Sequence, residues 1–184
     1  QILFRLAPDA HNTLQPERSK GGTLGVVFEP ARNFTASFDY WQVNMKDMLA
    51  NLPENVYFTN YADYKNLFVR NADGSLAYIN NTTMNLGGQI AAGVDVSANW
   101  EIARNTWGTF GAAIDGTYLT RFDNQLVPNG PWMSNVGQFG WASNGTTSSF
   151  PIITFRWKHN LRFSWTSGAW VRSANWVRYA LRRP

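Results

Sequence analysis

Long runs in which apolar and polar residues alternate constrain this chain more than any other feature of its sequence. In residues 90–101 the apolar side carries Ile90, Ala92, Val94, Val96, Ala98 and Trp100, and the other side carries Asp95, Ser97, Asn99 and Glu101. Five further runs show the same period, at residues 23–29, 34–40, 110–122, 157–166 and, more weakly, 170–179. Because successive side chains of a strand point to opposite faces, these runs predict an all-β chain of antiparallel strands with one apolar and one polar face.

The lengths of the runs and of their connections favour a membrane barrel. The runs extend over about 10 to 15 residues, whereas strands of soluble proteins have a mode near 5 to 6 and a membrane strand needs roughly 9 to 11. Short connections at 30–33, 103–106 and 166–169 alternate with long ones at 48–85 and 123–152. Short turns at one edge and long loops at the other are typical of outer-membrane barrels.

The composition agrees with a lipid-facing surface. Charged residues make up 15% of the chain, well below the roughly 25% usual in soluble domains, and aromatic residues also reach 15%. We expect two aromatic girdles at the strand ends. One contains Phe28, Phe34, Trp100, Trp107, Trp165 and Trp170 near the short turns, and the other contains Tyr40, Trp41, Tyr118, Phe122, Phe155 and Trp157.

Other classes of protein are either excluded or left as alternatives. The absence of cysteine excludes a disulfide scaffold, and no apolar run reaches the roughly 18 residues of a transmembrane helix. The net charge of +4 comes from scattered basic residues, so we expect no nucleic-acid partner. Two alternatives stay open: a soluble Trp-rich β-sandwich that binds carbohydrate, and a porin-like outer-membrane barrel.

Several motifs resemble the C-terminal part of the barrel of TonB-dependent outer-membrane receptors. In chain order they are Asn12-Thr13-Leu14-Gln15-Pro16-Glu17-Arg18-Ser19 followed by Gly25, Phe38-Asp39-Tyr40-Trp41, Met45-Lys46-Asp47, Asn85-Leu86-Gly87, Gly93-Val94-Asp95 and Arg156-Trp157-Lys158-His159-Asn160-Leu161. Thr13 departs from the family's pattern, which has Pro after the Asn. The resemblance covers residues 12–170, and its specificity comes from the order and hairpin spacing of the motifs.

The resemblance implies a 22-stranded barrel in the bacterial outer membrane, closed by an N-terminal plug domain. Such a receptor captures a scarce ligand with its extracellular loops and releases it inward when TonB acts on the plug. The implied ligand is an iron-siderophore complex, with haem, cobalamin and sugars as the other known classes. We therefore expect residues 1–184 to form a partial barrel domain of about six strands without a plug, which does not function alone. Its implied partners are outer-membrane lipid, its own plug, TonB and the small ligand.

Charged residues on the polar sides of the strands are candidate lumen-facing residues. They are Asp39, Asp95, Asp115, Arg121, Lys158 and Arg162. In a polar barrel interior such groups pair with one another and with a plug, or line a substrate path. No nucleophile elbow, phosphate loop or zinc motif occurs, and His11 and His159 have no partners at ligand spacing. We expect no enzyme activity, no cofactor and no metal site.

The two long loops are the predicted place of ligand recognition. Tyr and Trp side chains offer aromatic contacts and Arg a cationic one. The candidates are Tyr57, Tyr61, Tyr64 and Arg70 in the first loop, and Trp132 and Trp141 in the second. Loop aromatics can equally pack within their own loop, and the sequence leaves that alternative open.

Overall fold

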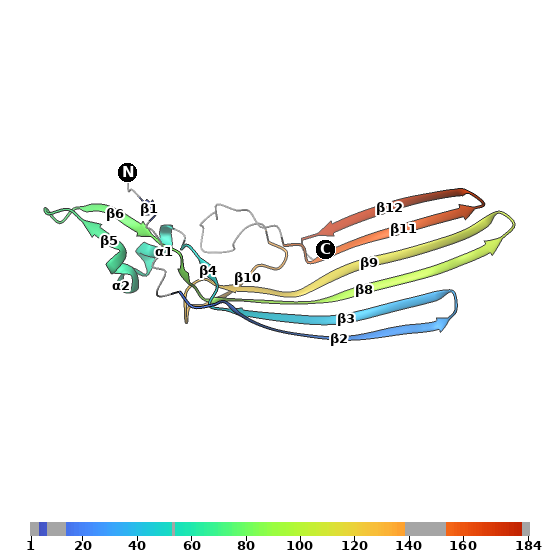
Figure 1. The fold of residues 1–184 in the computed structure, drawn as a ribbon, viewed down its shortest axis with the longest axis horizontal. Coiled ribbons are helices and arrows are strands. Elements are labelled where there is room, and N and C mark those ends of the chain that lie inside the picture. Colours follow the sequence, from blue (N-terminus) through green and yellow to red (C-terminus); the bar gives the residue numbers. More distant parts are fainter. Residues whose placement is uncertain (1–3, 7–13, 53, 139–153, 182–184) are drawn as a thin grey trace.

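Six long antiparallel strands form a curved wall, in a computed structural model that describes residues 4–6, 14–52, 54–138 and 154–181 (Figure 1). Along the sheet the order is β12 (Trp170–Ala180), β11 (Trp157–Ser167), β9 (Gly108–Gln125), β8 (Gly88–Asn105), β3 (Phe34–Lys46) and β2 (Arg18–Ala31). A short strand, β10 (Trp132–Ser134), pairs with the loop end of β9. We call the six long strands the wall. They confirm the predicted all-β antiparallel fold.

The wall strands are as long as membrane strands and are joined by short turns. They run from 11 residues in β11 and β12 to 18 residues in β8 and β9. Gly108, after the β8–β9 turn, has a φ of 126°, and Gly168 between β11 and β12 has a φ of 57°. Such backbone angles favour glycine, because a side chain there is strained. The three predicted short connections are thereby confirmed.

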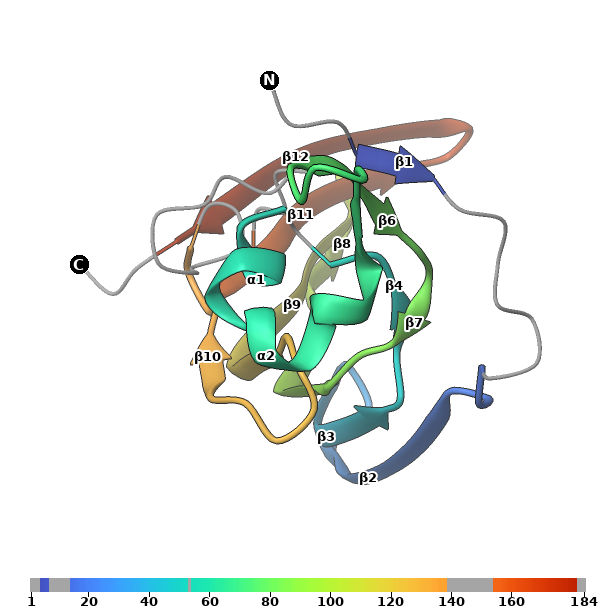
Figure 2. The same ribbon diagram turned by 90° about the vertical axis from the view of Figure 1, so that its left-hand side faces the viewer.

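The wall is a single open layer. Among the described residues, β2 and β12 each pair along one side only, and viewed from the loop end the strands follow an arc that does not close (Figure 2). No second sheet packs against the long strands in the described part of the chain. A β-sandwich needs two facing sheets. The sandwich alternative is therefore not supported.

The strand register separates an apolar face from a polar face. We call apolar the face that carries Val94 and Val96 of β8. On it, Leu24, Tyr40, Val94, Tyr118 and Trp157 lie opposite one another in one cross-strand row near the loop end. The register also pairs Phe34 with Trp100 and Phe110 with Trp165 on this face near the turns. Both ends of the apolar face therefore carry aromatic side chains.

Three expected girdle residues lie elsewhere. Trp41 and Phe122 stand opposite Gly93 and Ala91, on the polar side of β8. Phe155 precedes β11, and its ring centroid lies 4.8 Å from that of Tyr179. The loop-end girdle on the apolar face thus contains fewer aromatic residues than the sequence predicts.

The first long connection is a folded unit at the loop end of the wall (Figure 1). It contains β4 (Leu49–Ala50), α1 (Glu54–Thr59), α2 (Tyr61–Tyr64), the 3-10 helix η1 (Lys65–Leu67), β5 (Phe68–Arg70), β6 (Leu76–Asn81) and β7 (Met84–Asn85). The N-terminal strand β1 (Phe4–Leu6) pairs in parallel with β6. We call residues 47–87 the loop unit. No helix among the described residues is long and apolar enough to cross a bilayer.

Candidate functional site

The polar face of the wall brings five of the six predicted lumen residues together. The register places Asp39, Asp95, Thr117 and Lys158 in one cross-strand row. In the next row toward the turns, Asp115 lies between Ser97 and Asn160. Arg162, opposite Ala113, lies on the same face one row further along. Asp39, Asp95, Asp115, Lys158 and Arg162 therefore share one surface.

Within the rows, hydroxyl groups rather than ion pairs connect neighbouring strands. Thr117 donates a 2.6 Å hydrogen bond from Oγ1 to Oδ1 of Asp95, and the Ser37 and Ser97 hydroxyls are 3.0 Å apart. No ion pair joins Asp39, Asp95, Asp115, Lys158 or Arg162 to another residue in the described part of the chain. The expected pairing of these charges with one another is absent there. The Lys158 ammonium instead lies over the ring of Tyr179, 5.6 Å from its centroid.

Arg121 does not continue the polar row. The register shifts between Ala92 and Gly93, which pair with Arg121 and Leu119, so that Thr120 is an extra residue in β9. Such a bulge moves the following side chain to the other face. Arg121 consequently lies on the side of Ala92, where its Nε pairs with Asp123. The expectation that Arg121 shares the face of Asp115 is wrong because of this bulge.

On the polar face, Gly93 allows the ring of Trp41 to pack closely against the backbone of β8. The ring of Trp41 lies across Gly93, where an added Cβ would come within 2.8 Å of Cζ2 of Trp41. Toward the loops this face becomes apolar, with Val43, Ala91 and Phe122 beyond Trp41. This apolar row therefore separates the polar surface of Asp39 and Asp95 from the last row before the loops, where Gln89 donates a hydrogen bond to Asn124.

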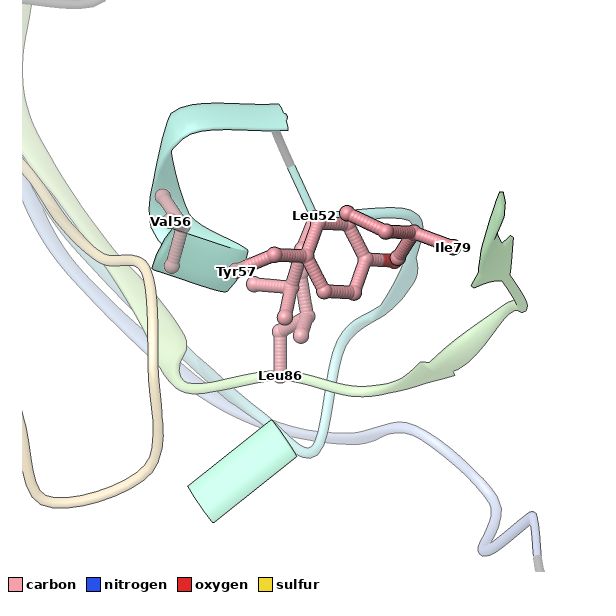
Figure 3. Close-up of a cluster of buried hydrophobic side chains, with 5 residues drawn as sticks. All are labelled: Leu52, Val56, Tyr57, Ile79 and Leu86. Atoms are coloured by element: carbon pink, nitrogen blue, oxygen red, sulfur yellow. The ribbon is translucent and has the colours of Figure 1, made fainter. Parts of the chain in front are cut away.

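Tyr57 belongs to the core of the loop unit. Its side chain is 0% exposed and packs with Leu52, Val56, Ile79 and Leu86 (Figure 3). Its hydroxyl donates a 2.9 Å hydrogen bond to Oδ1 of Asn81. Burial, together with nearby Tyr64, raises the pKa of Tyr57 to about 12. Because Tyr57 is buried, a ligand at the surface of the loop unit does not contact it.

Tyr64 is likewise part of this packing. Its ring meets Tyr57 edge-on, with 6.0 Å between the ring centroids. Burial raises the pKa of Tyr64, and the Asp63 carboxylate adds to the effect. In Tyr57 and Tyr64 the structure thus shows the alternative that the sequence left open, packing within the loop itself.

Two exposed aromatic residues of the loop unit, Phe58 and Tyr61, form a patch with partly buried Phe68 and with an arginine. Phe58 and Tyr61 both stand edge-on to Phe68, with ring centroids 5.6 and 4.9 Å away. Arg70 donates from Nη1 to the Gly74 carbonyl at 2.9 Å and from Nη2 to the Tyr61 hydroxyl at 3.5 Å. Tyr61 remains 43% exposed. We call Phe58, Tyr61, Phe68 and Arg70 the aromatic patch.

The second loop supplies one described candidate. Trp132 is 43% exposed in β10, where it lies opposite Gln125 of β9. Its ring also approaches Gly88, so that Trp132 lies at the loop ends of β8 and β9. Trp141 lies outside the described residues.

A polar clamp, which the sequence analysis did not assign, fixes the loop unit to the residues that lead into β2 of the wall. The Asn85 amide donates to the carbonyls of Gln15 and Asp47 at 2.7 Å and accepts from the Gln15 N–H at 2.7 Å. The Glu17 carboxylate accepts from the Leu49 N–H at 2.7 Å. Asp47, with a φ of 56°, makes the bend between β3 and β4. The sequence motifs around Glu17, Asp47 and Asn85 marked this place but not its role.

The described part of the chain contains no cluster of side chains that could hold a metal ion. There, no group of three or more His, Asp or Glu side chains converges. His159 lies on the apolar face, with its ring 5.5 Å from that of Trp157 and 6.4 Å from that of Trp176. His11 lies outside the described residues.

The comparisons with known proteins identify one family. A family model described as TonB dependent receptor-like, β-barrel, matches residues 5–183. No curated protein and no solved structure shows significant similarity to the chain. The match runs through all six wall strands and the loop unit.

Proposed function

We propose that this chain takes part in the uptake of an iron-siderophore complex. The chain belongs to the TonB-dependent receptor-like β-barrel family, which is a family of outer-membrane receptors and not of enzymes. In this proposal the six wall strands belong to a larger closed barrel. The plug domain and the TonB-contacting segment lie outside residues 1–184, so that this chain alone does not transport.

The open edges of the wall support the proposal of a larger barrel. Unpaired N–H and C=O groups cost several kcal/mol each in hydrocarbon, so only closed barrels span membranes with strands. Both β2 and β12 present such an edge among the described residues. Pairing with further strands removes this cost.

The observation that carries the choice of ligand is the aromatic patch at the loop end. Exposed rings next to a guanidinium suit a ligand that has flat or apolar surfaces and anionic oxygens. An iron-siderophore complex combines these properties. Tyr61 and Arg70 are the proposed contacts in the loop unit, with Trp132 and Trp141 in the second loop.

In the same proposal the polar face lines the path below the loops. Asp39, Asp95, Asp115, Lys158 and Arg162 carry both signs of charge over neighbouring rows. Their side chains then contact either the passing complex or the plug. Tyr57 and Tyr64 support the loop from within.

The test is binding and uptake of ⁵⁵Fe-labelled siderophores by cells that express the complete receptor. We expect Tyr61→Ala and Arg70→Gln each to weaken binding by about tenfold, in line with the loss of one aromatic or charge-assisted contact. The matched control is Lys65→Gln, which removes an exposed charge from the adjacent η1. Uptake of haem, cobalamin or a sugar in place of every iron-siderophore tested would overturn the choice of ligand.

A further inference from the structure

The apolar face of the wall changes its chemistry beyond the row of Tyr40. The next residue on this face of β3 is Gln42, followed by Asn44. At the corresponding rows of β9 the bulge places Arg121 and Asp123 on this face. In a membrane barrel the apolar face meets the lipid chains, and its aromatic border marks the headgroup level. The surface beyond Tyr40 therefore lies among the headgroups of the outer leaflet.

Three cations lie on this part of the face, and none of them forms an ion pair with a described residue. Arg18 lies directly opposite Lys46, and Lys20 lies opposite Asn44. No Asp or Glu occupies this face of β2 or β3. Like charges directly opposite one another destabilise a strand pair. A bound anion would offset that repulsion.

A hollow separates the cations from the apolar residues below them. Its volume is about 400 Å³, and its lining includes Lys20, Gly22, Leu24, Tyr40, Gln42 and Asn44. A Cβ added at Gly22 would meet nothing within 4 Å, so no described residue fills this space. The hollow has a cation at one end and Leu24, which is 78% exposed, at the other.

Hydrogen bonds hold the polar wall of the hollow in place. Tyr40 donates its hydroxyl proton to Oε1 of Gln42 at 3.1 Å, and Gln42 donates from Nε2 to Oδ1 of Asn44 at 3.1 Å. This ladder leads from the apolar border to the residue opposite Lys20. The hollow thus runs from an apolar border to a cation, and this arrangement favours a ligand that is apolar at one end and anionic at the other.

We propose that this hollow binds an outer-leaflet lipid through its phosphate group. Lys20, with Arg18 and Lys46 beside it, neutralises the phosphate, since ammonium and guanidinium groups are strong phosphate partners. The first part of an acyl chain follows Leu24 and continues along Val26 and Phe38 on the apolar face. The site is specific for an anionic lipid rather than for the transported ligand.

The test is titration of diphosphoryl lipid A into the complete receptor in detergent micelles, with bound lipid read by native mass spectrometry. We expect the double variant Lys20→Gln, Lys46→Gln to weaken binding about 25-fold, since each removed charge contributes roughly fivefold. Gly22→Phe keeps every charge and fills the hollow, and we expect a comparable loss. Phosphatidylcholine serves as the zwitterionic comparison lipid and should bind weakly and equally to all variants.

The control is Arg32→Gln, which removes one charge at the turn end of the same hairpin and should leave lipid A binding unchanged. Unchanged binding by the double variant, or by Gly22→Phe, overturns the proposal. So does an equal loss in Arg32→Gln, or inorganic phosphate that binds as tightly as lipid A. The readout is lipid binding, so its failure leaves the proposal of siderophore uptake untouched.

Discussion

The wall and the loop unit are stabilised in opposite ways. The loop unit has an apolar core of its own, made of Leu52, Val56, Tyr57, Ile79 and Leu86. Among the described residues of the wall, the buried apolar residues are the alanines Ala36, Ala92 and Ala113. Large side chains of the wall are exposed instead, and its strands are connected mainly by backbone ladders.

This difference shows where each region obtains its stability. Burial of apolar area is the main favourable contribution to folding. The loop unit obtains it internally, whereas in the proposed larger barrel the wall obtains it from lipid on the apolar face and from further strands at its edges. Substitutions in the two regions should therefore respond differently to the surrounding medium.

The largest effect is expected in the core of the loop unit. Tyr57→Ala should cost about 3–5 kcal/mol, because it leaves a cavity and removes one of the hydrogen-bond donors to Asn81. Hydrogen exchange in the complete receptor should show loss of protection in residues 52–86 and unchanged protection in β8 and β9. Equal loss in both regions would contradict separate sources of stability.

A slightly smaller effect is expected on the apolar face of the wall. Phe38→Arg should cost roughly 2–4 kcal/mol, because a cation there faces the hydrocarbon. The matched control Ser37→Arg, on the polar face, loses only the contact with Ser97 and should cost about 1 kcal/mol. Urea unfolding of the complete barrel in phospholipid bilayers gives both values. A larger loss in Ser37→Arg would reverse the assignment of the faces.

The clamp between the two regions should have an intermediate effect. Asn85→Ala leaves the carbonyls of Gln15 and Asp47 without their donor, at a cost of about 1–3 kcal/mol. We expect limited proteolysis to cut the loop unit faster while the wall stays intact. Asn51→Ala is the control, since Asn51 is exposed and its bonds to Asn81 and Thr83 stay within the loop unit. Similar cleavage rates in both variants would show that Asn85 does not fix the unit.

The last expected effect is confined to alkaline pH and is absent at neutral pH. The pKa of Tyr57 is raised from 10.0 to about 12, so the neutral phenol is favoured in the folded loop unit. The resulting stability is fully present below pH 10 and is lost as the pH rises through 12. Titration of tyrosinate absorbance should show a late step that Tyr57→Phe removes. A titration without that step would contradict the burial of this phenol.

The sequence predicted the wall well because a strand's environment repeats every two residues. The alternation of Val94, Asp95, Val96 and Ser97 is reproduced in the register of β8 with both neighbours. The bulge at Thr120 could not be predicted, because Leu119-Thr120-Arg121-Phe122 reads as continued alternation. One extra residue there moved Arg121 and Phe122 to the other faces.

The loop unit was not predictable in the same way. Its helices α1 and α2 have six and four residues, too few turns to show a helical period. Whether Tyr57 points into the unit and Tyr61 out of it depends on contacts with β6 and β5, which are distant in sequence. The sequence identified the aromatic residues but not the division between core and surface.

The central claim is that the apolar face of the wall meets lipid and the polar face meets the lumen. Residues 1–184 contain no cysteine, so cysteines introduced singly at Val96 and Ser97 can be spin-labelled once any cysteine elsewhere in the receptor is replaced. Accessibility to oxygen and to a water-soluble nickel chelate is then measured in liposomes. We predict high oxygen and low nickel accessibility at position 96, and the reverse order at position 97. Equal accessibilities at the two positions, or the opposite order, would contradict the claim.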